Sequence, residues 1–502
     1  MSIIAAIDAG SNAIRMVVGQ VDEAWEVKPL ENIRLPVRLG QDVFSKGYLE
    51  EVTIRQTEEA FLQFEHVAQN YNVQKLRAVA TSAAREAANS DLLMERVARA
   101  SGIQLELISG EEEARLIHQA VVRALNLKNK RALLIDIGGG SIEVTTSNGP
   151  NIIATDSHTL GTVRLLEKLG ARDEDPNALS KFIQKYVEAS RFRIGQDIGG
   201  EKIQVCVGTG GNVEEIGRLR ERLFKGKSDR FVTLDELKEL IRRLSGLTYQ
   251  ERIQKWRLRP DRADVILPAS IVLYTIANEA RVKQILIPQV GLKDGILLDL
   301  ADELAHRPQP QRREQAWESA LHLGRKYRFD EKHAELTARL AASLFEQSKP
   351  LHGLGDEQLL SLEMAALLHD IGHFINPLDH EKHGFYILMA NRLIGLTTRE
   401  QGIVANLVRY HRKEVPSTGD ENFKSLSHQD RTIVNKLTAL LRLADSTDVG
   451  HDHLVTDVKL YKNGQGWHIR VSGQTDRMLA NWALEKRKQL FEDIFDVPLT
   501  VN

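Results

Sequence analysis

The chain has 502 residues, of which 42% are hydrophobic, and its 67 Lys and Arg residues nearly balance 69 Asp and Glu residues. The formal net charge of −2 argues against a partner that is a nucleic acid polymer. A single cysteine excludes an internal disulfide framework and is typical of a reducing cytoplasm. Asp8 interrupts the first apolar run, and no apolar stretch is long enough to span a bilayer. We therefore expect a cytoplasmic protein of three or four domains, without a signal peptide or a membrane partner.

The N-terminus has an apolar strand that runs into an aspartate and a turn of small residues. Residues 3–8 form the strand and end at Asp8, the turn contains Gly10, Ser11 and Asn12, and a second strand spans 14–18. Glycine permits a tight reversal of the backbone. Backbone amides that point outward from such a turn form a nest for phosphate oxygens. We therefore expect Gly10, Ser11 and Asn12 to bind phosphate.

A helical pattern over residues 52–69 and a short strand at 76–80 come after the first hairpin. Thr81 and Ser82 stand directly after this strand, where they either cap the next helix or bind phosphate. We include Arg85, which lies one helical turn further on, among the candidate phosphate ligands.

A run of three glutamates comes after the next strand, at residues 104–108. Ser109 and Glu112 have the spacing of a helical capping box. This leaves Glu111 and Glu113 for another role, and a carboxylate in this first helical turn could orient a water molecule. The pattern itself does not choose between these two residues.

The arrangement of the N-terminus recurs at residues 132–144, where four apolar residues run into Asp136, three glycines, Ser141 and Glu143. We expect Gly138, Gly139, Gly140 and Ser141 to bind phosphate, as the first turn does. Two carboxylates beside such a nest suggest that Asp136 and Glu143 bind Mg²⁺, or Mn²⁺ in its place. The alternative is an ordinary glycine-rich hairpin. A repeated unit predicts two similar halves that face one another.

A third glycine-rich turn comes after a strand that begins at residue 205. Gly210 and Gly211 open a helix there, so both are candidate phosphate ligands. Residues 217–262 are rich in arginine and lysine, including Lys225 and Lys227. This region is either a solvated helical face or a path that attracts a polyanionic chain.

Residues 306–313 have the composition of a linker, and a helical pattern continues from there to about residue 450. His333, His369, Asp370 and Asp445 are spaced like the residues of an HD-type phosphohydrolase, and further histidines stand among them. Imidazole and carboxylate ligands suit a divalent metal. The alternative is that these side chains hydrogen-bond to one another and hold the helices in register. Residues 454–502 are predicted to form two strands and one helix.

The paired units of strand, aspartate and glycine turn resemble those of the acetate kinase, sugar kinase, heat-shock ATPase and actin superfamily. Three motifs, at residues 8–12, 109–115 and 136–143, together resemble the exopolyphosphatase / guanosine pentaphosphate phosphatase family. The resemblance implies that Glu113, which precedes Ala-Arg, is the catalytic base, and that Asp136 and Glu143 are associated with the metal. It also implies a homodimer.

We therefore expect an α/β fold with two actin-like halves at 1–122 and 123–305, an all-α HD-like domain at 314–450 and a small α/β unit at 451–502. The resemblance implies processive release of terminal phosphate from inorganic polyphosphate. The closest alternative is hydrolysis of guanosine pentaphosphate (pppGpp) in the same cleft. A sugar-type kinase and a non-catalytic polyphosphate or nucleotide sensor are the further alternatives.

Overall fold

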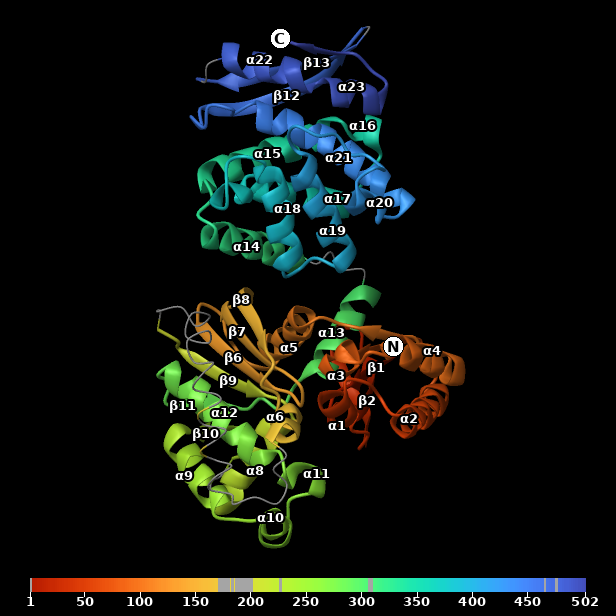
Figure 1. Ribbon diagram of the computed structural model, residues 1–502, viewed down its shortest axis with the longest axis vertical. Helices are drawn as coiled ribbons and strands as arrows, with labels where there is room; N and C mark the ends of the chain where they lie inside the picture. Colours follow the sequence, from red (N-terminus) through yellow and green to blue (C-terminus); the bar gives the residue numbers. More distant parts are fainter. Residues whose placement is uncertain are drawn as a thin grey trace. The chain divides into compact units, whose positions relative to one another are not determined.

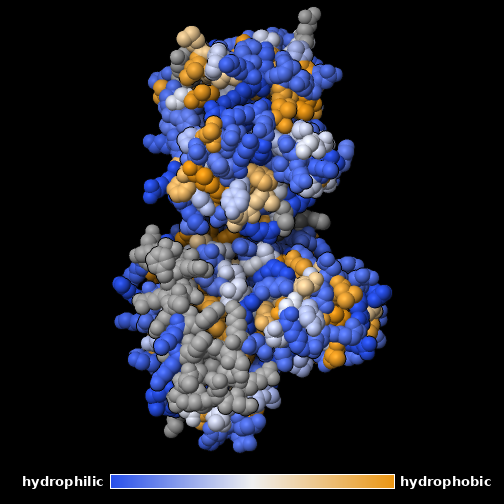
Figure 2. All heavy atoms as spheres, in the orientation of Figure 1, coloured by the Kyte–Doolittle hydropathy of each residue, from blue (hydrophilic) through white to orange (hydrophobic). Residues whose placement is uncertain are grey.

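A computed structural model describes residues 2–169, 181, 185, 202–224, 228–305, 310–464, 466–474 and 477–502 (Figure 1). The chain divides into two compact units, Met1–Gln309 and Pro310–Asn502. Among the residues that Figure 2 colours, most side chains on the visible face are hydrophilic. None of the described helices is long and apolar enough to cross a membrane.

The first half of unit 1 is built on a five-stranded sheet. Its strands are β1 (Ser2–Ala9), β2 (Ile14–Val21), β3 (Val27–Leu35), β4 (Lys75–Ala80) and β5 (Leu105–Leu107), in the order β3-β2-β1-β4-β5. The helices of this half are α1 (Leu39–Lys46), α2 (Glu51–Asn70), α3 (Ser82–Glu86) and α4 (Ser90–Ser101). The helix predicted at 52–69 is therefore confirmed. Phe61 and Phe64 of α2 are fully buried, because the apolar positions of this helix share one face toward the sheet.

The second half is built on a six-stranded sheet of order β10-β11-β9-β6-β7-β8. The strands are β6 (Arg131–Ile137), β7 (Ile142–Asn148), β8 (Asn151–His158), β9 (Val205–Thr209), β10 (Phe231–Thr233) and β11 (Gln284–Leu286). The helices here are α5 (Gly110–Ala124), α6 (Thr162–Leu169), α8 (Gly211–Leu223), α9 (Leu234–Ser245), α10 (Tyr249–Trp256), α11 (Pro260–Ala263), α12 (Ile266–Glu279) and α13 (Leu292–Leu304).

The two sheets repeat one topology, as the duplicated motif predicts. In each sheet a central strand pairs antiparallel with the next strand in the chain and parallel with the strand that comes after a crossover: β1 with β2 and β4, and β6 with β7 and β9. The predicted fold of two actin-like α/β halves is confirmed. α5 and α13 lie between the two sheets (Figure 1), and their apolar residues share one core with β1 and β6. This shared core fixes the two halves against each other.

Unit 2 begins with a helical bundle. Its helices are α14 (Pro310–Lys326), α15 (Glu331–Gln347), α16 (Lys349–His352), α17 (Asp356–Leu368), η1 (Ile371–Phe374), α18 (His380–Ala390), α19 (Thr398–Tyr410), α20 (Glu421–Lys424) and α21 (His428–Ser446). The linker predicted at 306–313 is wrong in its second part, because α14 already begins at Pro310. Proline is favoured in the first helical turn, where its missing N–H has no partner to lose.

A small sheet packs on this bundle. It contains β12 (Val455–Asn463), β13 (Gly466–Gly473) and β14 (Leu499–Val501), with α22 (Arg477–Arg487) and α23 (Gln489–Phe495) between the last two strands. The prediction of two strands and one helix therefore missed β14 and the break between the helices. Val458, Ile469 and Phe491 of this part belong to the same buried cluster as Leu344 and Leu440 of the bundle. The bundle and the small sheet thus share one core.

Candidate functional site

Both halves of unit 1 contribute turns to one cavity. The sequence-predicted site residues that line it are Gly10, Ser11, Asn12, Glu113, Asp136, Gly138, Gly139, Ser141, Gly210 and Gly211, and Asp8 lines it as well. The two hairpin turns approach closely: a Cβ atom on Gly139 would lie 3.0 Å from Ser11 Cβ, and one on Gly140 would lie 3.0 Å from Ser11 Oγ. Gly210 has a φ of +93°, which also favours glycine. The small residues are thus needed for the two hairpins to meet.

Three buried carboxylates come together here: Glu113 and Asp136 line the cavity, whereas Glu143 is not part of its lining. One oxygen of each of Glu113, Asp136 and Glu143 lies within 4.8 Å of the others. Asp136 and Glu143 are directly opposite each other in the register of β6 and β7, so the hairpin itself brings them together. Glu113 reaches them from the first turn of α5.

The structure distinguishes the three consecutive glutamates of α5. Ser109 Oγ accepts a hydrogen bond from the backbone N–H of Glu112 at 3.2 Å, which caps the helix. The Glu112 carboxylate accepts hydrogen bonds from Arg115 at 2.8 and 2.9 Å instead of closing the predicted capping box. Glu111 lies outside the cavity lining, whereas Glu113 is 7% exposed and lines the cavity. Helical geometry thus brings Glu113, and not Glu111, into the cavity lining.

Burial and mutual repulsion raise the pKa values of these carboxylates. The pKa of Glu113 is held well above its ordinary value, first by burial and then by Glu143 and Asp136. Burial also raises the pKa of Glu143 to about 7, although Ser157 Oγ donates to its carboxylate at 2.8 Å. The pKa of Asp136 rises to about 6, again mainly through burial, and is opposed by a 2.6 Å hydrogen bond from Thr209 Oγ1. The cluster therefore favours a bound proton or a bound cation.

The same carboxylates fit a divalent cation. Glu113 Oε2 and Glu143 Oε2 are buried and accept no hydrogen bond from the described residues. Buried acceptors without a donor are costly, and a cation between them would satisfy both. An all-oxygen set of carboxylates is what Mg²⁺ and Mn²⁺ prefer.

The cavity also contains cationic side chains that the sequence did not single out. The guanidinium groups of Arg15 and Arg262 converge on the backbone of Gly211, where an added Cβ would lie 2.7 Å and 2.3 Å from them. Burial lowers the pKa of Arg262 to about 9, and the nearby charge of Arg15 contributes. Two guanidinium groups that face the same small space would attract an anion such as phosphate. Lys293 also lines the cavity, at the start of α13.

The available sequence signals for these cations were weak. Arg15 is seven residues after Asp8, as Glu143 is seven residues after Asp136, so alignment of the two copies of the motif would have found it. Lys293 stands in a Gly-Leu-Lys-Asp-Gly segment. Arg262 had no signal beyond its place in a basic stretch, since only the fold brings α11 to the cavity.

Two predicted phosphate ligands lie outside the cavity lining. Gly140 O accepts a 2.8 Å hydrogen bond from Arg164 Nε, so this residue supports the turn. Arg85 donates a hydrogen bond to the backbone carbonyl of Ile108. Its charge nevertheless lowers the pKa values of Glu113 and Glu143, against the raising effect of burial. Phosphate binding by these two residues stays a prediction.

The basic stretch that begins on α8 is largely paired with acids where the structure describes it. Arg218 and Arg222 approach Glu215 at 3.0 and 3.2 Å, and Arg220 approaches Glu236 at 3.0 Å. Lys225 and Lys227 lie outside the described residues. The described arginines therefore fit an ion-paired helical face better than a path for a free polyanion.

Unit 2 brings together the four residues that were predicted as a second metal site. His333 lies on α15, His369 and Asp370 come directly after α17, and Asp445 lies on α21. His369 Nε2 is 3.5 Å from Asp445 Oδ1 and 3.5 Å from Asp370 Oδ2. Burial raises the pKa of Asp370, but His369 and the other surrounding imidazoles outweigh it and hold that pKa well below its ordinary value.

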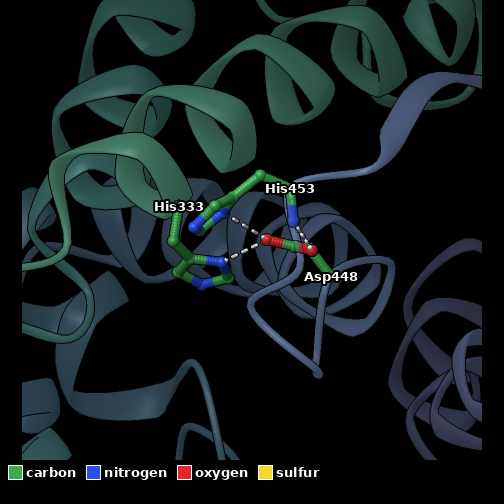
Figure 3. A group of neighbouring side chains, drawn as sticks. All are labelled: His333, Asp448 and His453. Carbon is green, nitrogen blue, oxygen red and sulfur yellow. Dashed lines mark hydrogen bonds and ion pairs between the residues drawn. The ribbon is translucent and has the colours of Figure 1, made fainter. Parts of the chain in front are cut away.

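A residue outside this set, Asp448, orients His333. Figure 3 shows that the rings of His333 and His453 both point toward the Asp448 carboxylate. His333 Nδ1 is 2.7 Å from Asp448 Oδ2, and the backbone N–H of His453 donates to Oδ1 at 3.1 Å. A carboxylate that holds one ring nitrogen of a histidine leaves the other nitrogen free to bind a metal.

Two glycine-rich hairpins, convergent guanidinium groups and buried carboxylates in one cavity define an α/β protein that handles phosphate groups. The chain belongs to the Ppx/GppA phosphatase family, which it matches over residues 17–304, and residues 316–490 match domain III of Ppx/GppA phosphatase. The family resemblance inferred from the three motifs is therefore confirmed, and membership identifies the chain as a hydrolase.

Similar proteins include one that acts on a nucleotide. The guanosine-5'-triphosphate,3'-diphosphate pyrophosphatase of Photobacterium profundum is 26% identical over 453 residues, which is 88% of this chain and 85% of the relative. The Ppx/GppA protein of Aquifex aeolicus has a TM-score of 0.53 at 23% identity, over 61% of this chain and 99% of the other. An exopolyphosphatase from Cytophaga hutchinsonii has a TM-score of 0.57 at 22% identity, over 60% and 98%. The chain shares the fold of these two structures over about 60% of its length.

Proposed function

We propose that the protein hydrolyses inorganic polyphosphate from its end, by attack of water on the terminal phosphorus. The observation that supports this most directly is the position of Glu113, a buried carboxylate with a raised pKa, in a cavity formed by two glycine-rich hairpins. A raised pKa brings a carboxylate closer to the value that suits proton transfer at neutral pH.

In this mechanism the terminal phosphate lies between the two hairpins. Backbone amides around Ser11 and Gly139 would bind its oxygens, and Arg15 and Arg262 would neutralise the charge of the adjoining phosphate. Glu113 would accept a proton from water while the water oxygen forms a bond to phosphorus. The bond from that phosphorus to the bridging oxygen breaks, and the shortened chain leaves with the electron pair. Catalysis of this kind depends mainly on positioning and charge stabilisation.

We further propose that Asp136 and Glu143 hold Mg²⁺, or Mn²⁺ in its place. When bound, the ion would supply positive charge that stabilises the phosphoryl group. The residues of the chain would still position the phosphate and the water, because the hairpins and Glu113 are part of the folded protein. Without a cation, protons would occupy the carboxylate cluster.

A second candidate substrate is pppGpp, because a relative that matches 88% of this chain is named as an enzyme that acts on it. The same cavity would hold its terminal phosphate, and the nucleoside would lie outside. The two candidates share their chemistry and differ in the group attached beyond the second phosphate. Only a direct comparison of substrates separates them.

The test is to measure phosphate release from long-chain polyphosphate, pppGpp and ATP at equal terminal-phosphate concentration. We expect kcat/KM to be highest for polyphosphate. A higher value for pppGpp would assign the second candidate. Phosphate transfer to a sugar, with no release into water, would assign a kinase, and binding of polyphosphate without turnover would assign a sensor.

A further inference from the structure

Six imidazoles surround a single carboxylate in unit 2, and they divide evenly between its two oxygens. The three whose Nε2 atoms face Asp370 Oδ1 are His373, His380 and His411, at 3.4, 3.2 and 3.7 Å. The three whose Nε2 atoms face Oδ2 are His333, His369 and His451, at 4.0, 3.5 and 3.9 Å. The carboxylate thus stands at the centre of two separate groups of nitrogen atoms.

These separations have the size expected for ligands that share a cation. Most of them exceed the length of an ordinary N–H···O hydrogen bond. Metal–nitrogen and metal–oxygen bonds are about 2.1 Å long, so two ligand atoms of one ion lie roughly 3.0–3.4 Å apart at right or tetrahedral angles. The nitrogen and oxygen atoms around Asp370 are near this range or slightly beyond it.

The buried histidines also have their Nε2 atoms directed inward. His369 Nδ1 is 2.8 Å from the carbonyl oxygen of Ala366, and His411 Nδ1 is 2.7 Å from that of Val408. His380 Nδ1 lies 3.2 Å from the carbonyl oxygen of Pro377. A carbonyl only accepts, so each Nδ1 carries the proton, and in a neutral imidazole Nε2 then has a free lone pair. His333 is oriented in the same way by Asp448 (Figure 3).

The free nitrogens meet in pairs. His333 Nε2 is 3.2 Å from His369 Nε2, and His380 Nε2 is 3.1 Å from His411 Nε2. Two lone pairs at this distance repel unless a cation lies between them. Because there are two such pairs, one on each side of Asp370, the arrangement provides for two cations.

We propose that this cluster binds two divalent first-row transition-metal ions bridged by the Asp370 carboxylate. His333, His369 and Asp445 Oδ1 would hold the first ion with Asp370 Oδ2. His373, His380 and His411 would hold the second ion with Asp370 Oδ1. Mixed imidazole and carboxylate ligands suit Mn²⁺, Fe²⁺ or Zn²⁺. The four residues predicted from the sequence would complete the ligand set of the first ion and supply only Asp370 to the second.

The surroundings of the cluster support a site that ions can enter. Arg487 binds the other oxygen of Asp445, so Oδ1 alone is directed at the histidines. The side chains of His373 and His451 are each 41% exposed, and their rings stack on those of the buried His380 and His333. Solvent therefore reaches the cluster past an imidazole on each side.

The test is to count the ions in the full-length protein, purified without a metal-affinity tag. The protein is stripped with EDTA, loaded with Mn²⁺, desalted and analysed for manganese, and its electron paramagnetic resonance spectrum is recorded. The wild type should show the spectrum of an exchange-coupled pair. His411→Ala should lose one ion per chain and Asp370→Ala two, and both should lose the coupling. His428→Ala, an exposed histidine on α21, should keep the wild-type count.

Two other outcomes would contradict the proposal of two bound ions. If His369→Ala loses one ion but His411→Ala loses none, the cluster holds a single ion. If no variant changes the manganese content, protons rather than metals join the paired nitrogens. The melting temperature of every variant in EDTA shows whether it folds. His380→Gln and His411→Gln, which keep a polar side chain, replace any alanine variant that does not fold.

Discussion

The two hairpins of unit 1 have the same strand arrangement. They differ in the side chain that lies opposite the aspartate of the central strand. Each has an aspartate at the end of its central strand, and in the register of the sheet Asp8 pairs with Arg15 whereas Asp136 pairs with Glu143. In the first hairpin the guanidinium approaches the carboxylate at 3.9 Å and lowers its pKa, although burial raises that pKa more strongly. In the second hairpin a like charge adds to the effect of burial.

This difference indicates how the two copies of a repeated fold can take different binding roles in one site. The backbone turns of both hairpins can bind phosphate oxygens, because amides point outward from each. We expect the opposite charges at this register position to make Arg15 attract an anion and Glu143 a cation. We expect substitutions at the two positions to separate substrate binding from metal binding.

The largest effect should come from Glu113→Gln. Loss of a general base typically lowers the rate by about 10²- to 10⁴-fold. KM should change little, and the melting temperature should not fall, because the substitution removes a buried charge beside two others. Steady-state kinetics and thermal unfolding check this. Glu111→Gln, in the same helical turn but outside the cavity lining, is the control and should keep full activity.

A smaller effect is expected from Glu143→Gln. Even a residue that only supports a metal ligand typically contributes about 10- to 100-fold to metal affinity, so direct loss of a ligand should cost about 100-fold. The Mg²⁺ concentration for half-maximal rate should rise accordingly, and saturating metal should restore part of the rate. A metal titration identical to that of the wild type would mean that the ion is held elsewhere.

Arg15→Gln should give the complementary result. A hydrogen bond to a charged group contributes about 1.5–3 kcal/mol, so KM should rise roughly 10- to 100-fold. The Mg²⁺ requirement should stay unchanged, because a protonated guanidinium has no lone pair to offer a metal ion. If this variant changes the metal requirement as strongly as Glu143→Gln does, the division of roles between the hairpins is wrong.

Sequence reasoning reached the fold because the repeated motif fixes it. Two strands of apolar residues that each end in aspartate and glycine predict two sheets with one topology, and the sheets agree. The choice of Glu113 over Glu111 needed the direction of the α5 helix, and Arg262 needed the packing of α11, both of which depend on contacts distant in the chain. The same holds for the six imidazoles around Asp370, since residues far apart in the sequence supply them.

The smallest predicted effect concerns stability and again contrasts the hairpins. Burial, with help from Asp136, raises the folded-state pKa of Glu143 from 4.5 to about 7, so the folded protein binds more protons than the unfolded chain between these values. The stability that this group contributes is therefore complete below pH 4.5 and is lost as the pH rises through 7. One unit of pKa shift corresponds to about 1.4 kcal/mol, which is equivalent to a melting temperature change of about 2–4 °C.

In EDTA, the melting temperature of the wild type should fall between about pH 5 and 8 by more than that of Glu143→Gln, which cannot titrate. Arg15→Gln should show the same fall of the melting temperature with pH as the wild type. An equal fall in all three proteins would show that the Glu143 carboxylate has an ordinary pKa.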